Sequence, residues 1–256
     1  MILNNHSLIV DYQIDTNKFP LAKKCKFIKA VIKENQYLYI PKKWFHLVIT
    51  EPDTVALSFE IMNIDGNTNN FFYKYYKNKI PFKRNGNKFK FDYENFIKKS
   101  MDRKFRVIHS NSYEVAPVIK NEYQKKYYTV QILSDIIKGK NNDEYLHIIS
   151  NELDDINNYR EITDFINFDQ EIINKYSNNL FEYNFDDKFK EYDKDVKINF
   201  IKSIWMSFDK PINSGLHYDD YDNFLYVLHG KKTVYLSSPE NYDNLYIKSL
   251  NKAETI

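Results

Sequence analysis

Short runs of β-branched and aromatic residues, separated by polar breaks, alternate in the N-terminal and C-terminal parts of the chain. Such runs are typical of β-strands, because branched and aromatic side chains pack well on a pleated surface. We therefore expect two groups of strands with a different kind of structure between them. The expected strands are residues 27–32, 37–41, 45–50, 54–62, 201–208, 223–230 and 232–238.

The middle of the chain has apolar residues at helical spacing. Residues 92–104 predict a helix with Asp92 as its N-cap and basic residues toward its C-terminal end. Residues 127–142 predict a second helix, because isoleucine and leucine recur at helical spacing before Gly139, which is typical of a helix end. Residues 152–195 are polar, acidic and aromatic, and predict one or two more helices.

Length and composition limit the classes of protein to consider. A chain of 256 residues is long enough for one domain with a full core, and we expect a single domain over residues 1–256. The 37 basic and 35 acidic residues give a net charge of +2, which indicates neither a nucleic-acid coat nor an acidic tail. The single cysteine, Cys25, excludes an internal disulfide framework. With no apolar run of membrane-spanning length, we expect an intracellular protein, cytoplasmic or nuclear, without membrane contact.

His217 and Asp219 lie beside two strand-like runs that meet near Gly230. On an extended strand, residues two apart point to the same face, so this pair supplies two of the three ligands of a 2-His-1-carboxylate iron centre. The motif alone is weak, because a surface turn with a solvated histidine and aspartate has the same pattern. No histidine follows Lys232, so a third ligand must come from elsewhere in the chain.

The block 204–240 around this pair resembles the central motif of the JmjC/cupin-8 family of iron(II)- and 2-oxoglutarate-dependent oxygenases. The pattern is nearest to the asparaginyl-hydroxylase and tRNA-wybutosine-hydroxylase branches of that family. In them a His-Tyr-Asp triplet is followed by an asparagine, a Gly-x-Lys and a strand ending in proline. The matching residues are His217, Tyr218, Asp219, Asn223, Gly230, Lys232 and Pro239.

A second family motif occurs in residues 36–62, before the first motif instead of after it. It contains Ile40 and Pro41, then two aromatic residues and His46, and then a strand with Ser58. A lone histidine after two aromatics is otherwise a common core or surface residue. The resemblance implies that His46 is the missing ligand and that the motif order is circularly permuted, which compact domains tolerate when their termini lie close together.

The expected fold is α+β, mainly β: a double-stranded β-helix, or jelly roll, with flanking helices and circularly permuted strands. Residues 105–148 resemble the segment that normally begins these domains. Residues 63–104 then form a bridge between the permuted halves. His109 and His147 fall in the expected helical middle, where we interpret both as structural, and we interpret His229 as a surface strand residue.

The resemblance also implies the chemistry of the site. Fe(II) is held by His46, His217 and Asp219, and 2-oxoglutarate and O2 take the open positions of the metal. Lys232 pairs with the distal carboxylate of 2-oxoglutarate. The other residues implied to bind the co-substrate are Ser214, Tyr145, Asn223 and Ser58. The reaction releases succinate and CO2 and leaves a hydroxyl group on the substrate.

Three functions follow as alternatives. The first is hydroxylation of a protein side chain, and the second is hydroxylation of tRNA or another nucleic acid. The third is a non-catalytic cupin-fold binding protein. A separate question is the oligomeric state, because in a homodimer His46 would complete the partner's site. The basic and aromatic stretch 73–90 is the candidate for RNA binding. The alternative interpretation, which we favour, is a solvated arm. Its basic residues are Lys74, Lys77, Lys79, Lys83, Arg84, Lys88 and Lys90.

Overall fold

The structure, a computed structural model, describes residues 5–64, 80–86, 90–110, 128–138, 145–151, 156–163, 165–167 and 198–247. Strands dominate it, as the sequence predicts, and every strand expected from the runs of branched and aromatic residues is present. The strands are β1 (Ile28–Lys33), β2 (Gln36–Ile40), β3 (Phe45–Thr50), β4 (Val55–Ile64), β5 (Phe82–Asn85), β6 (Lys90–Phe91), β7 (Lys104–Ser110), β8 (Tyr128–Ile132), β9 (Tyr145–Asn151), β10 (Ile166–Asn167), β11 (Ile198–Ser207), β12 (Ile212–Asn213), β13 (His217–Tyr218), β14 (Asn223–His229) and β15 (Lys231–Ser237). The helices are α2 (Tyr93–Ser100), α4 (Leu133–Ile137), α5 (Ile156–Thr163) and the 3-10 helices η1 (Pro20–Lys24) and η3 (Pro239–Asn244).

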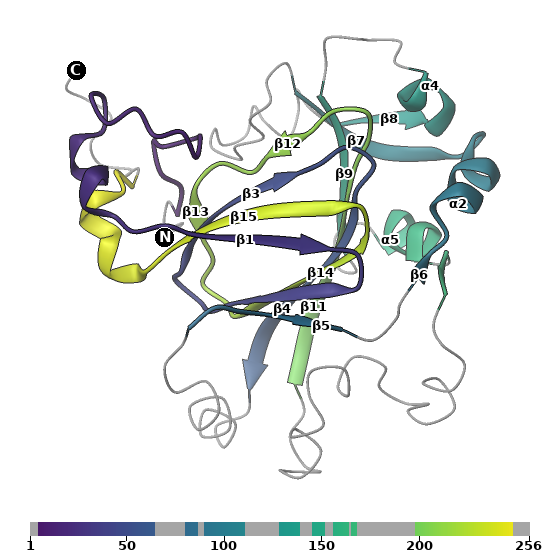
Figure 1. The fold of residues 1–256 in the computed structure, drawn as a ribbon. Helices are drawn as coiled ribbons and strands as arrows, with labels where there is room; N and C mark the ends of the chain where they lie inside the picture. Colours follow the sequence, from purple (N-terminus) through teal and green to yellow (C-terminus); the bar gives the residue numbers. More distant parts are fainter. Residues whose placement is uncertain are drawn as a thin grey trace.

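Two β-sheets pack against each other (Figure 1). The small sheet has the order β1-β15-β3-β12, with β13 also paired to β3, and the large sheet has the order β5-β2-β14-β4-β11-β9-β7-β8. Strands that follow one another in the sequence alternate between the sheets, as β1 and β2, β3 and β4, and β14 and β15 do. This arrangement is a jelly-roll β-sandwich, and it confirms the expected fold class.

The period-two alternation of the strands divides the buried residues into three clusters. Between the sheets, an apolar cluster includes Leu38, Val227 and Val234. A second cluster lies between the outer face of the small sheet and the N-terminal segment. Its members include Ile9, Phe19, Phe45, Leu47 and Leu245. A third cluster covers the outer face of the large sheet, so both sheets are buried on both faces over much of their area.

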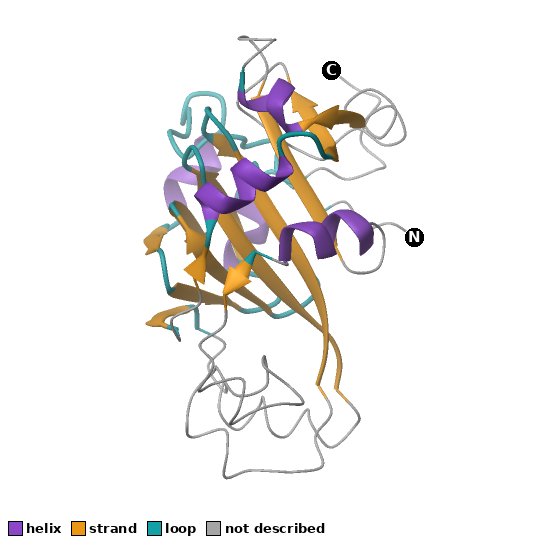
Figure 2. Cartoon of the chain, turned by 90° about the vertical axis from the view of Figure 1, so that its right-hand side faces the viewer, coloured by secondary structure: helices purple, strands orange, loops and turns teal. Residues whose placement is uncertain are grey.

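Helices α2 and α5 lie over the outer face of the large sheet, in front of its long strands in Figure 2. The side chain of Asp92 accepts a hydrogen bond from the backbone N–H of Asn95, which confirms the predicted N-cap. Phe96 of α2 and Ile162 of α5 are fully buried in this cluster. Among the described residues, no helix is long and apolar enough to cross a membrane.

The helix predicted for residues 127–142 is wrong for residues 128–132 and confirmed for residues 133–137, whereas residues 127 and 139–142 lie outside the described residues. Tyr128–Ile132 is instead strand β8, an edge strand paired with β7, and only Leu133–Ile137 forms the short helix α4. The helical spacing of the apolar residues applies only to this last part, in which Leu133 and Ile136 are buried. His109 and His147, expected in a helical region, lie on strands β7 and β9.

The bridge expected over residues 63–104 is described only in part. Strand β5 pairs with β2 at the edge of the large sheet, and α2 covers the outer face of that sheet. Residues 65–79 and 87–89 of the stretch, which include Lys74, Lys77, Lys79 and Lys88, lie outside the described residues. The domain boundaries therefore stay a prediction.

The N-terminal segment and the residues after η3 lie side by side (Figure 1). The backbone N–H of Leu8 donates to the carbonyl of Tyr246 over 2.9 Å, and Ser7 bridges to Ile247. The expected proximity of the two ends of the chain is thus confirmed for these residues. It removes one physical obstacle to a permuted strand order, which itself stays a prediction.

The turn between β14 and β15 gives the first testable prediction. Gly230 has a φ of +79°, and a Cβ there would lie 2.5 Å from Oγ1 and 2.9 Å from Cα of Thr54. Gly230→Ala should therefore lower the free energy of unfolding by roughly 1–3 kcal/mol, because strain and the clash add. Urea denaturation measures this loss. The exposed neighbour Lys231→Ala is the control, with an expected change within about 0.5 kcal/mol; equal losses for the two variants would contradict the prediction.

Candidate active site

A cavity of about 300 Å³ lies between the two sheets. Its walls are side chains from the inner faces of β3, β4, β9, β11, β14 and β15, together with Asn5 and His6 of the N-terminal segment. Both apolar and polar side chains line it, and the volume suits a small organic molecule. The inner residues of β3 are His46, Val48 and Thr50, because the intervening side chains point outward into the apolar cluster around Phe45 and Leu47.

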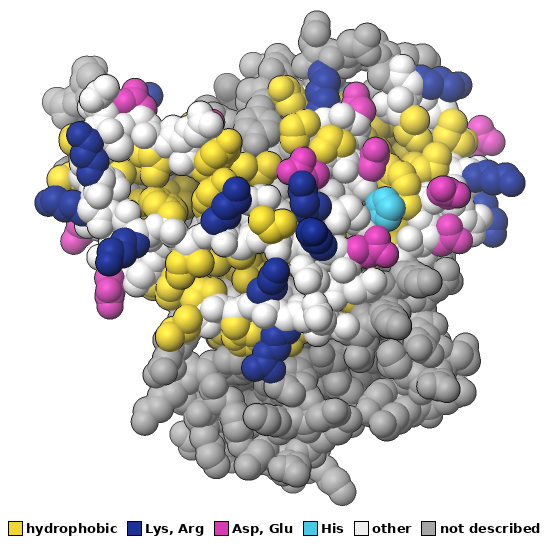
Figure 3. All heavy atoms as spheres, in the orientation of Figure 1, with side chains coloured by type: hydrophobic (Ala, Val, Ile, Leu, Met, Phe, Trp, Pro, Cys, Tyr) yellow, Lys and Arg dark blue, Asp and Glu magenta, His cyan; other side chains and the backbone are white. Residues whose placement is uncertain are grey.

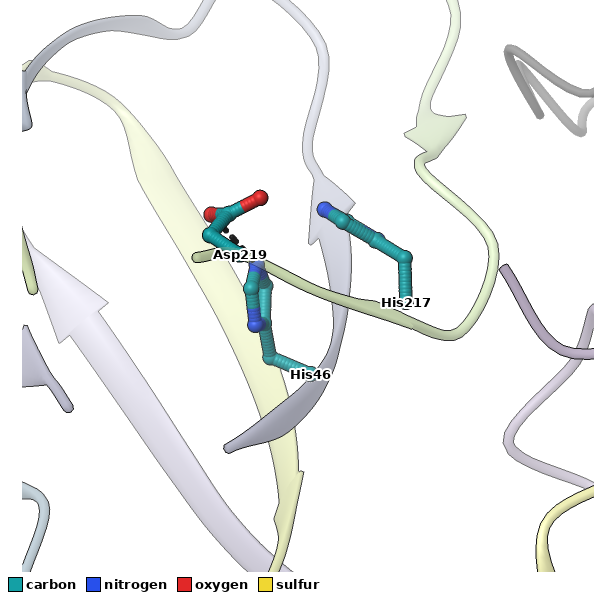
Figure 4. A group of neighbouring side chains, drawn as sticks. All are labelled: His46, His217 and Asp219. Atoms are coloured by element: carbon teal, nitrogen blue, oxygen red, sulfur yellow. Dashed lines mark ion pairs between the residues drawn. The ribbon is translucent and has the colours of Figure 1, made fainter. Parts of the chain in front are cut away.

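His46, His217 and Asp219 meet at this cavity (Figure 4). One ligand atom from each residue lies within 4.8 Å of the others, and the two imidazole centroids are 4.2 Å apart. Strand pairing causes this approach, because His46 on β3 is directly opposite His217 on β13. The structure thus brings together within one chain the three residues that the two sequence motifs single out.

Both imidazoles are oriented by the backbone. Nδ1 of His46 lies 3.0 Å from the carbonyl oxygen of Trp44, and Nδ1 of His217 lies 3.0 Å from the carbonyl oxygen of Gly215. A carbonyl oxygen only accepts, so each Nδ1 carries a proton, and in the neutral imidazole Nε2 keeps the lone pair that can bind a metal. Fixing the tautomer in this way is typical of metal-binding histidines.

A chain of side chains orients the carboxylate of Asp219. The hydroxyl of Ser58 donates to Oδ1 of Asn223 over 2.9 Å, and the amide of Asn223 hydrogen-bonds the Asp219 carboxylate. Oδ2 of Asp219 lies 3.4 Å from Nε2 of His46. Burial alone would raise the pKa of Asp219, but the positive charge and the Nε2–H hydrogen bond of the protonated His46 imidazole outweigh it and hold that pKa below its usual range.

Glu60 adds a second carboxyl group to the same wall of the cavity, two residues after Ser58 on β4. Burial, and then the negative charge of Asp219, raises the pKa of Glu60 to about 7. Within the described part of the chain, no cationic side chain lies at ion-pair distance from Glu60. The sequence motifs gave no sign of this residue, although its alternation with Ser58 places it on the inner face.

Lys232 is buried in the cavity with only 2% of its surface exposed. Its ammonium donates to Oγ1 of Thr50 over 2.9 Å and lies 5.7 Å from the ring centroid of Trp205. No carboxylate among the residues that the structure describes pairs with it. Burial lowers the pKa of Lys232 to about 7, because the charged form loses its hydration.

The remaining residues that the resemblance assigns to the co-substrate divide into two groups. Ser214 lines the cavity, and its hydroxyl accepts from the N–H of Val48 while it donates to the carbonyl of Gly215. Asn223 and Ser58 line it beside Asp219. Tyr145 is not among the lining residues, and its ring instead lies 5.1 Å from the ammonium of Lys210.

Two histidines of the site were not predicted from the sequence. His147 of β9 lines the cavity and is 3% exposed. His6, in the N-terminal segment, stacks on His217 with a centroid separation of 5.0 Å. His229, in contrast, lies at the surface on β14 and stacks against Tyr93. This position agrees with its interpretation as a surface strand residue.

The donor set fits a divalent transition metal together with an anionic organic ligand. Two neutral imidazole nitrogens and one carboxylate on one side of a centre are the ligands of a facial 2-His-1-carboxylate site, which leaves three positions open. A buried ammonium without a carboxylate partner is costly, and a carboxylate of the ligand would neutralise it.

A family model described as a cupin-like domain matches residues 65–255. The match includes the resembling segments 105–148 and 204–240 and leaves out the motif in residues 36–62, which carries His46. A "Lysine-specific demethylase JMJ30" of Arabidopsis thaliana is 34% identical over 59 residues, which are 23% of this chain and 14% of that protein.

A "Jumonji C domain-containing protein 5" of Drosophila melanogaster is 35% identical over 57 residues, 22% of this chain and 14% of the relative. The chain thus aligns with about one seventh of the length of each of these two relatives. No solved structure matches it.

The isolation of Lys232 gives a prediction about stability. Lys232→Met should raise the free energy of unfolding at pH 6 by roughly 1–4 kcal/mol, because methionine keeps the length and removes an unpaired buried charge. The pKa of Lys232 is about 7 in the fold and has its ordinary value of 10.5 in the unfolded chain. Between these values the unfolded chain binds more protons, so the parent gains stability as the pH rises and the advantage of methionine shrinks.

Urea denaturation of both proteins between pH 6 and pH 10 measures this difference. Lys231→Met, at the exposed neighbouring lysine, is the matched control and should show no such pH-dependent gain. If Lys232→Met were less stable than the parent at pH 6, Lys232 would have a partner that compensates its burial.

Proposed function

Because this chain belongs to the JmjC/cupin-8 family of cupin-like domains, we propose that it is an Fe(II)- and 2-oxoglutarate-dependent dioxygenase that hydroxylates a protein side chain. Members of this family are typically oxygenases that use iron(II) and 2-oxoglutarate. One observation carries the proposal: His46, His217 and Asp219 meet in the same cavity that holds the unpaired ammonium of Lys232.

In the proposed mechanism, His46, His217 and Asp219 would hold the metal through their imidazole Nε2 atoms and the carboxylate. Iron(II) supplies the redox chemistry that couples decarboxylation of 2-oxoglutarate, by O2, to hydroxylation of the substrate. The Trp44 and Gly215 carbonyls fix the imidazole tautomers, and Asn223 holds the carboxylate. Lys232 neutralises the far end of the co-substrate, while the apolar residues between the sheets exclude water.

The choice of a protein as substrate is supported by the name of one relative, a lysine-specific demethylase. The nucleic-acid alternative depends on the basic stretch 73–90. The structure describes Lys83 and Arg84 of β5 from this stretch, but most of it lies outside the described residues. On the face drawn in Figure 3, lysine and arginine side chains are scattered among hydrophobic and acidic ones and form no continuous band. The partner, a homodimer, and the cytoplasmic or nuclear location stay predictions.

Turnover of 2-oxoglutarate tests the activity directly. The purified protein with Fe(II), ascorbate and O2 should convert 2-oxoglutarate to succinate, followed by NMR, and Asp219→Ala should abolish this conversion. We expect slow conversion of 2-oxoglutarate in the absence of a protein substrate. A peptide that is hydroxylated should accelerate this conversion. Metal-loaded protein that binds 2-oxoglutarate but never forms succinate would favour the non-catalytic cupin-fold alternative.

Metal binding gives a separate prediction. The protein should bind one Fe(II), or manganese(II) as a surrogate, and His46→Ala should weaken manganese binding by at least tenfold, because one of three ligands is lost. Electron paramagnetic resonance titration of free manganese measures the affinity. His229→Ala, which removes a half-buried histidine outside the cavity lining, is the control. Unchanged affinity in His46→Ala would exclude His46 as a ligand.

Co-substrate binding gives the next prediction. Binding of 2-oxoglutarate should require the metal, and Lys232→Ala should weaken it roughly 10- to 150-fold, since hydrogen bonds to charged groups contribute about 1.5–3 kcal/mol. Isothermal titration calorimetry with and without manganese measures the metal requirement, and titration of the manganese-loaded variants measures the loss of affinity. Lys231→Ala serves as the control, and equal affinities in the parent and Lys232→Ala would remove the co-substrate assignment.

A further inference from the structure

The proposed mechanism gives no role to His147 on β9 and Trp205 on β11, two of the side chains that line the cavity. Both ring nitrogens of His147 and Nε1 of Trp205 are buried and have no hydrogen-bond partner. The His147 side chain is 97% buried, since its exposed fraction is 3%. Unpaired buried donors are unfavourable and uncommon in folded proteins, so two of them in one cavity point to a ligand that completes them.

Strand register places the two side chains together. His147 is directly opposite Ser207 in the β9–β11 pair, and Trp205 precedes Ser207 by two residues. The two side chains therefore lie on the same face and are diagonal neighbours, within reach of one ligand group. That face is the one that lines the cavity.

A third donor reaches this place from the opposite sheet. The ammonium of Lys232 lies 5.7 Å from the ring centroid of Trp205. Burial, and then the charge of Lys232, lowers the pKa of His147 to about 3, so the imidazole is neutral and carries one N–H donor. Donors from both sheets thus surround one end of the cavity, which we call the anion recess, consisting of His147, Trp205, Lys232 and Thr50.

We propose that His147 and Trp205 join Lys232 in binding the distal carboxylate of 2-oxoglutarate, an inference that rests on the proposed function. A carboxylate accepts about four hydrogen bonds, enough for the ammonium of Lys232, the imidazole N–H and the indole N–H. Thr50 keeps the ammonium in place through its hydroxyl. His147 then supplies the hydrogen bond that the family resemblance assigns to Tyr145, two residues earlier on the same strand.

The anion recess therefore determines which 2-oxo acids the site binds. It recognises a ligand by its second carboxylate, whereas the metal recognises the 2-oxo acid group at the other end. 2-Oxopentanoate has the same chain length as 2-oxoglutarate, with a methyl group in place of the distal carboxylate. It therefore reports on the metal end alone.

The test is calorimetric titration of the manganese-loaded protein with both ligands. His147→Leu and Trp205→Phe each delete the donor and keep an apolar side chain of similar shape. Each substitution should lower the affinity for 2-oxoglutarate roughly tenfold or more. The affinity for 2-oxopentanoate should stay within about twofold of that of the parent. His147→Asn retains a donor and should recover part of the loss. His229→Leu, at the half-buried histidine of β14 outside the cavity lining, is the matched control.

The outcomes separate this inference from the proposed function. If Lys232→Ala loses 2-oxoglutarate but His147→Leu and Trp205→Phe bind it like the parent, the inference is wrong and the proposed function stands. Equal weakening of both ligands would also overturn it, since the residues would not act on the distal carboxylate. If the manganese-loaded parent binds no 2-oxoglutarate, both fail. Thermal melts identify any unfolded variant, and Trp205→Phe decides the question should His147→Leu not fold.

Discussion

The site depends on the register of one strand, β3, against β13 and β15. In this register His46 is opposite His217, and Thr50 is opposite Lys232. The same strand therefore sets both the metal ligands and the partner of the buried ammonium. Because the side-chain period of a strand is two, a slip by one residue would turn His46 and Thr50 outward and bring Phe45 and Ile49 inward. The outward burial of Phe45, Leu47 and Ile49 under the N-terminal segment makes such a slip costly.

That register holds a cavity in which several polar groups lack the partners that would stabilise the fold. Lys232 has one hydrogen bond, and His147 and Trp205 have ring nitrogens without partners. Stability must come from elsewhere, and the outer faces of the sheets provide it. The cluster under α2 and α5 and the cluster under the N-terminal segment bury large aromatic side chains. The helices and the N-terminal segment are therefore what allow the interior to remain polar and adapted to a ligand.

The sequence predicts the strands well, because runs such as residues 45–50 and 223–229 are branched, aromatic and bounded by polar breaks. It also predicts that His46, His217 and Asp219 act together, since two motifs of one family each supply what the other lacks. Residues 128–132 were assigned to a helix because local spacing cannot reveal that β7 is available as a pairing partner.

Glu60, His147 and Trp205 were not predicted for a related reason. Alternation along a strand divides its residues into two sets, but only the three-dimensional pairing decides which set faces the cavity. Both faces of β9 and β11 are largely buried, so hydrophobicity does not distinguish them. A histidine in an apolar strand then looks like a core residue until the opposite sheet, with Lys232, is known.

The N-terminal segment has a part in the site that neither the motifs nor the family match indicates. The backbone N–H of Ser7 donates to Leu216, and the N–H of Tyr218 donates to Asn5. The short strand with His217 is thus bonded to β3 on one side and to the N-terminal segment on the other. The backbone hydrogen bonds of Asn5 and Ser7 therefore fix the segment that carries His217 from the side opposite β3, and the same pairing places the ring of His6 against that of His217.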